Sequence, residues 1–74
     1  MKKLDLHGMK HAEAKAAVTR FIEDNWNSGE EAKIVSGNSV RMRGIVLAAL
    51  DEYKLTYQIS EMFGFNGYVT TWFE

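Results

Sequence analysis

Apolar and polar residues alternate near the start of the chain and then change to a helical period. In residues 3–7, KLDLH, the two leucines share one face while Asp5 and His7 share the other, which predicts a strand. Over residues 11–26 apolar side chains recur at helical spacing with charged side chains mostly opposite, which predicts an amphipathic helix. The Asn-Ser-Gly sequence at 27–29 is expected to end this helix.

The next part of the chain repeats this order. Residues 32–36, AKIVS, predict a second short strand, and residues 39–53 carry the clearest helical stripe of apolar side chains. Asn38 or Ser39 can cap this second helix. Gly44 lies inside the helix, where glycine costs about 1 kcal/mol relative to alanine. A small residue at that position suggests close packing, or else it is incidental.

The last two segments predict a β-hairpin. Residues 55–63 and 67–74 flank the sequence Gly-Phe-Asn, with Asn66 and Gly67 expected at the turn. The predicted order is therefore strand, helix, strand, helix, strand, strand. Because strand–helix–strand crossovers are right-handed, both helices should lie on one face of a mixed sheet. We expect an α/β fold, a two-layer sandwich with a mixed four-stranded sheet whose other face is relatively bare.

Composition and charge narrow the class of protein. A chain of 74 residues suits a single domain, and we assign residues 1–74 to it. The absence of cysteine excludes disulfides and thiolate metal sites, and two histidines leave little material for a metal cage, so no metal site is assigned. No apolar run approaches the roughly 18 residues that span a membrane, so we expect a soluble cytoplasmic protein without a membrane partner.

The net charge limits how the protein could bind nucleic acid. At −1 it argues against a protein that coats nucleic acid through bulk charge. A local basic patch remains compatible with this charge, and a small binding site requires nothing larger.

The predicted parallel strands bring two polar segments to one edge of the sheet. Asp5 and His7 end the first strand, and the residues after the second strand are Ser36, Gly37, Asn38 and Ser39. Ligands of open α/β sheets bind at this carboxyl edge, and the helices that begin there point free N–H groups at the same space. The edge is therefore a candidate anion site. A parallel third strand would bring the loop of residues 63–67, which includes Phe65, beside Asp5 and His7.

Cations cluster at the predicted helix starts. Arg41 and Arg43 lie in the first turn of the second helix, where positive charge opposes the helix dipole, so stability explains them poorly. The planar guanidinium group suits phosphate oxygens. Lys10 and His11 add charge at the start of the first helix. These four residues are candidate phosphate contacts.

Two motifs resemble a known family. LDLHG before an amphipathic helix, followed by an apolar strand, a glycine-containing turn and a helix with early arginine, resembles the small MutS-related (Smr) domain. The second family motif has a glycine, any residue, a glycine and then a leucine–arginine pair. Here Ser39 stands in place of the second glycine, and Met42-Arg43 in place of the pair.

The resemblance implies a fold and a set of activities. The fold would be similar to the C-terminal domain of translation initiation factor three. Some members of the family are DNA-nicking or RNA-cleaving endonucleases, and others bind nucleic acid without cleaving it. Metal dependence varies, so the resemblance leaves open whether Mg²⁺ takes part. Most relatives carry the domain fused to larger proteins, whereas we expect a stand-alone copy here.

Three functions follow from these patterns. In the first, an endonuclease acts on DNA or RNA: His7 moves a proton, Asp5 orients it or holds a metal, and Arg41 and Arg43 with the N–H groups of residues 37–39 hold the phosphate. In the second, the same site binds nucleic acid without chemistry. In the third, the bare sheet face meets a protein partner.

Structural alternatives stay open for the same residues. His7 could be a structural histidine bonded to a loop carbonyl, and Asp5 could cap the second helix or the preceding loop. Phe63 and Phe65 suit either packing or stacking on unpaired bases. Four aromatic residues are assigned to packing in the core or on the sheet face: Trp26, Tyr57, Tyr68 and Trp72. Four acidic residues are assigned to a solvated face: Glu23, Asp24, Glu30 and Glu31.

Overall fold

The computed structural model describes residues 2–37, 39–59 and 67–73. Its elements follow the predicted order, strand, helix, strand, helix, strand, strand. They are β1 Lys2–Asp5, α1 His11–Asp24, β2 Glu31–Val35, α2 Val40–Glu52, β3 Tyr57–Ile59 and β4 Tyr68–Trp72. No helix in the described ranges is long and apolar enough to cross a membrane.

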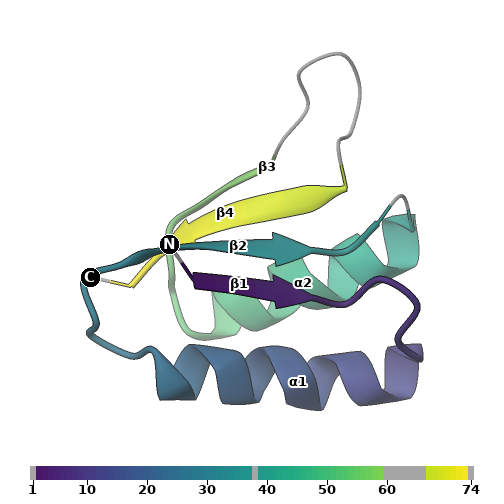
Figure 1. Ribbon diagram of the computed structural model, residues 1–74, viewed down its shortest axis with the longest axis horizontal. Helices are drawn as coiled ribbons and strands as arrows, with labels where there is room; N and C mark the ends of the chain where they lie inside the picture. Colours follow the sequence, from purple (N-terminus) through teal and green to yellow (C-terminus); the bar gives the residue numbers. More distant parts are fainter. Residues whose placement is uncertain (1, 38, 60–66, 74) are drawn as a thin grey trace.

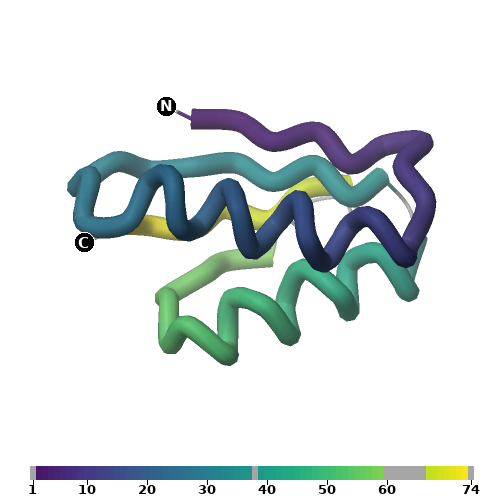
Figure 2. Tube along the Cα trace, turned by 90° about the horizontal axis from the view of Figure 1, so that it is seen from below, coloured from purple at the N-terminus to yellow at the C-terminus, as the bar shows by residue number. Residues whose placement is uncertain are grey.

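The strands form one mixed four-stranded sheet in the order β1-β2-β4-β3. β1 pairs with β2 in parallel, and β4 lies antiparallel between β2 and β3. β3 therefore runs in the same direction as β1 and β2. The crossovers through α1 and α2 move across the sheet in the same sense, so both helices lie on the same side of it, as Figures 1 and 2 show. The predicted two-layer α/β fold is confirmed.

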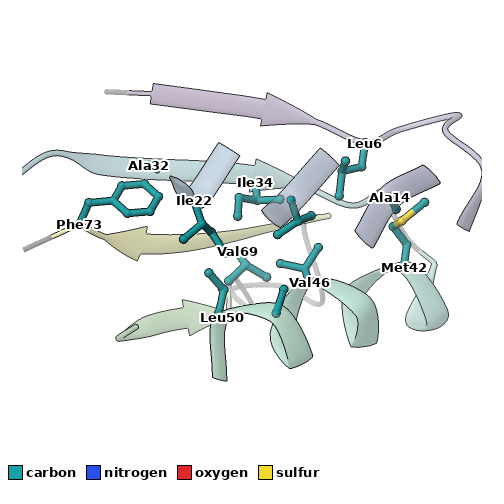
Figure 3. Close-up of a cluster of buried hydrophobic side chains, with 12 residues drawn as sticks. Leu6, Ala14, Ile22, Ala32, Ile34, Met42, Val46, Leu50, Val69 and Phe73 are labelled. Carbon is teal, nitrogen blue, oxygen red and sulfur yellow. The ribbon is translucent and has the colours of Figure 1, made fainter. Parts of the chain in front are cut away.

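The core lies between the sheet and the two helices. Alternating strand residues and the helical stripes supply it, and Figure 3 shows their side chains meeting between the layers. The fully buried apolar side chains include Leu6, Val18, Ile22, Ile34, Val46, Leu50 and Val69. The predicted helical stripes are thus confirmed as the buried faces of α1 and α2.

Element boundaries differ from the prediction where side chains intervene. β1 ends at Asp5, two residues earlier than expected, because the Asp5 carboxylate accepts a hydrogen bond from the His7 backbone N–H at 2.8 Å. β3 and β4 form the predicted antiparallel pair, with Ile59 opposite Val69. The turn expected at Asn66 and Gly67 includes Asn66, which lies outside the described residues.

Two packing predictions are wrong. Trp26 is 49% exposed rather than a core residue, since it lies beyond the end of α1 and packs against the Tyr53 ring with centroids 5.8 Å apart. Gly44 lies on the exposed side of α2, and no described neighbour comes within 4 Å of where its Cβ would be. Close packing therefore does not explain this glycine.

The side of the sheet opposite the helices forms an open face. Side chains that alternate with the core residues point to it, and the described helices leave it uncovered (Figure 1). We define this open face by Lys3 of β1, Lys33 of β2, and Tyr68, Thr70 and Trp72 of β4. All five are exposed or half-buried, so the predicted bare face is present.

Candidate nucleic-acid interface

A tight turn presents His7 at the end of β1. The Leu6 carbonyl accepts a hydrogen bond from the Met9 N–H at 2.9 Å, which closes a turn from Leu6 to Met9. Gly8, the third residue of this turn, has φ +82°, the value that a type II turn requires there. Leu6 is fully buried and anchors the turn, while His7 is exposed at its corner. The LDLHG sequence thus builds a fixed turn with one histidine facing solvent.

Asp5 acts on this turn through the backbone. Its Oδ1 accepts the His7 N–H, an interaction that holds the chain where it leaves the strand. The contact of Asp5 is thus with the main chain of His7.

The end of β2 is held by a residue far along the chain. The Gly67 carbonyl accepts hydrogen bonds from the N–H groups of Ser36 and Gly37, at 2.8 and 3.0 Å. Ser36 is 3% exposed, and its hydroxyl donates to the carbonyl of Gly37 at 3.2 Å. A Cβ on Gly67 would lie 3.3 Å from the Gly37 backbone, so glycine permits this close approach. The candidate site thus includes Gly67.

His7 and Gly37 lie side by side. A Cβ on Gly37 would be 3.3 Å from Cδ2 of His7, and Gly37 itself has φ +69°. Asp5 belongs to the same edge, because it pairs with Val35 at the end of β2. The predicted clustering of Asp5, His7 and Gly37 at one edge is confirmed, and the reason is the parallel register of β1 and β2.

The two helices that begin at this edge are capped differently. Ser39 is the N-cap of α2, and its hydroxyl accepts the Met42 N–H at 3.1 Å. Lys10 is the N-cap of α1, and in the described part of the chain no side chain caps that helix. Helix geometry leaves further N–H groups of each first turn without an intrahelical acceptor. Both starts therefore attract anions, but Ser39 already occupies one donor of α2.

The predicted cations surround these helix starts. Lys10 and Arg41 are exposed, and Arg43 is half-buried. His11 is exposed in the first turn of α1 and lines a cavity of about 360 Å³ between the helices, together with Ile45 of α2. Two other predicted contacts, Asn38 and Phe65, lie outside the described residues, as do Phe63 and Asn66.

One protein family matches most of this chain. The model of the Smr domain matches residues 4–63 of the 74-residue chain, a range that includes both the His7 turn and the start of α2. The chain belongs to the Smr domain family. No curated protein and no solved structure matched in the two other comparisons. Membership of the Smr family points to a nuclease-related or nucleic-acid-binding function.

The described part of this Smr domain offers few side chains that could bind a metal ion together. Among the described residues, no three His, Asp or Glu side chains are grouped so that they could hold a metal ion. Asp5 offers one carboxylate at the edge. Mg²⁺ commonly takes one or two carboxylates and completes its shell with water and substrate phosphate.

Gly67 was not assigned as a site residue from the sequence, although a parallel third strand was expected to bring its loop, residues 63–67, beside Asp5 and His7. It has φ +82° and packs against Gly37. The signal available in the sequence was its position directly before a strand, but which element it would contact depended on the sheet order. Gly67 also lies beyond the range that the Smr family model matches.

Proposed function

We propose that this Smr domain is a cytoplasmic endonuclease that cleaves phosphodiester bonds of DNA or RNA, with His7 as its proton-transfer group. The observation that carries the proposal is the exposed imidazole of His7 beside Gly37, at the edge where both helices begin. Histidine exchanges protons near neutral pH, because its ordinary pKa is about 6.5. Family membership supports the same activity.

The residues of the edge divide into three roles. The imidazole of His7 accepts a proton from the attacking oxygen or donates one to the leaving oxygen. The N–H groups at the helix starts, with Arg41 and Arg43, hold the phosphate and the charge that develops on it. Asp5 is a positioning residue, since it acts through the His7 backbone.

Binding without cleavage is the second candidate function. It is favoured by Ser39, whose hydroxyl occupies the Met42 N–H that a phosphate would otherwise contact. Each helix start retains other donors and nearby cations, so the edge would still attract a polyanion. Under this alternative, His7 would be a contact rather than a catalytic residue.

The test is an assay of cleavage and retention. Labelled single- and double-stranded RNA and DNA are incubated with the protein, with and without Mg²⁺. The His7→Ala variant should lose about 10²-fold or more in cleavage, the scale that a positioned acid–base group contributes. Its retention of nucleic acid and its unfolding midpoint should change little, because the His7 side chain is exposed.

His11→Ala provides the contrasting variant, since it removes the other histidine of the chain. It should weaken retention slightly while leaving cleavage of saturating substrate intact. A wild-type protein that retains nucleic acid but never cleaves it would exclude the endonuclease and leave the binding function. Absence of both retention and cleavage would exclude both functions.

A further inference from the structure

We infer that the open face is a stacking platform for unpaired bases, so that the proposed site acts on single-stranded nucleic acid. The inference rests on the proposed function, in either its catalytic or its binding form, and names its substrate class. It comes from the arrangement of aromatic and cationic side chains on the sheet.

The aromatic side chains of the open face lie on one strand. Tyr68 and Trp72 are four residues apart on β4, so they point to the same side and stand about 13 Å apart along the strand. Both residues are half-buried, so each is partly accessible. Bases of a single strand stack on such rings regardless of sequence, whereas paired bases have their faces covered by neighbouring pairs.

A polar row crosses the sheet between these two rings. Lys3, Lys33, Thr70 and Gln58 are register partners on the four successive strands. Like charges directly opposite each other disfavour strand pairing, so sheet stability does not explain the adjacent lysines. A phosphate backbone crossing the face would be neutralised by them, and Thr70 and Gln58 add hydrogen-bonding groups.

Lys33 already contacts an aromatic ring of the platform. Its ammonium lies 4.2 Å from the centroid of the Tyr68 ring. This cation–π contact holds positive charge directly over the stacking surface. Because the lysine stem is flexible, the ammonium can move to a phosphate when a base takes its place on the ring.

Two carboxylates of the sheet limit where the single-stranded nucleic acid would run. Asp5 pairs with Val35 and hence Tyr68 at one end of the sheet, and Glu31 pairs with Trp72 at the other. Positive charge is therefore concentrated in the central row, and Glu31 disfavours phosphate beside Trp72. The strand should cross at Lys3 and Lys33, with the stronger stacking at Tyr68.

The platform is continuous with the candidate site. Tyr68 follows Gly67, whose carbonyl holds Ser36 and Gly37 beside His7. A nucleic-acid strand that stacks on Tyr68 therefore needs to extend only past Gly67 to bring its next phosphates to the edge with His7. This continuity favours nucleic acid over a protein partner as the occupant of the open face.

The two tryptophans of the chain provide a direct test. Trp72 lies on the open face, whereas Trp26 packs on Tyr53 at the end of α1. In Trp26→Phe, a single-stranded 12-mer of deoxythymidine or uridine should quench the remaining Trp72 emission. In Trp72→Phe, the same titration should leave Trp26 emission unchanged. A duplex of equal length should bind at least 10-fold more weakly and leave Trp72 unquenched.

Substitutions on the open face measure the two contributions. Tyr68→Ala should weaken single-strand binding by about 10-fold, as expected for the loss of one stacked base. Lys3→Ala should lower the salt slope by about 1, while Lys15→Ala, an exposed lysine on α1, should leave it unchanged. If Tyr68→Ala does not fold, Tyr68→Leu replaces it, because leucine keeps apolar bulk without a π-face.

The outcomes separate this inference from the proposed function. Retention or cleavage of single strands without Trp72 quenching, and without an effect of the Tyr68 variants, would overturn the platform and leave the proposed function standing. Equal binding of duplex and single strand would also overturn it. A wild-type protein that neither retains nor cleaves any nucleic acid would remove both.

Discussion

The starts of the two helices lie at the same edge of the sheet but are built differently. A glycine with positive φ precedes each of them, Gly8 at +82° and Gly37 at +69°. A Cβ on Gly37 would meet His7 at 3.3 Å, whereas no described neighbour lies within 4 Å of one on Gly8. Ser39 caps α2 with its side chain, while α1 begins at Lys10 without such a cap among the described residues.

This difference separates two ways of using a helix start. At α2 the backbone is fixed by internal contacts, to Gly67, to His7 and through the Ser39 hydroxyl. At α1 the turn fixes the approach of the chain but leaves the first N–H groups to solvent or to a ligand. The start of α2 therefore contributes mainly shape and arginine charge, and that of α1 contributes more open donors.

The largest expected effect on this comparison comes from the glycines. Gly8→Ala should destabilise by about 1–2 kcal/mol, the cost of a left-handed backbone for a residue with a Cβ. Gly37→Ala should cost more and should also reduce cleavage, because the added methyl group displaces the His7 ring. Urea unfolding and the cleavage assay measure the two effects.

Gly44→Ala is the matched control for both glycine variants. Gly44 lies within α2 on its exposed side, so alanine should stabilise the protein by about 1 kcal/mol. Equal destabilisation by Gly8→Ala and Gly37→Ala would contradict the contact with His7 as the feature that distinguishes the two turns.

An intermediate effect is expected from the cations. The Arg41→Ala, Arg43→Ala double variant should flatten the slope of log affinity against log salt by up to about 2, because each lost phosphate contact removes roughly one released counterion. Lys10→Ala should flatten it by about 1. Fluorescence anisotropy at several salt concentrations measures the slope. Binding that ignores salt would argue against phosphate contacts at either helix.

The smallest effects concern the caps. Ser39→Ala should destabilise by about 1 kcal/mol and Ser39→Gly by only a few tenths, since glycine is an acceptable N-cap. Both variants release the Met42 N–H for a phosphate. Both should therefore bind nucleic acid more tightly than the wild-type protein, despite their lower stability. Lys10→Ser would add a side-chain cap to α1. It should raise stability by up to about 1 kcal/mol and weaken the binding of nucleic acid. Thermal unfolding with anisotropy tests both; unchanged affinity in all three variants would show that neither helix start binds phosphate.

The sequence by itself determined the order of the elements, the buried faces of both helices and the polar edge. These features follow from local rules: alternation in a strand, helical period and the preference of serine for an N-cap. The LDLHG motif determined that His7 is exposed, because Leu6 is buried and Gly8 permits the turn. The parallel crossover then predicted that His7 and Gly37 would meet.

The tertiary structure alone decided the contacts that depend on register. The hydrogen bond from the Ser36 N–H to the Gly67 carbonyl joins residues 31 positions apart, and the central place of β4 in the sheet brings them together. Trp26 and Gly44 were misjudged for a related reason. Periodicity assigns a residue to a face, but whether another element covers that face is set by where the sheet and the other helix end.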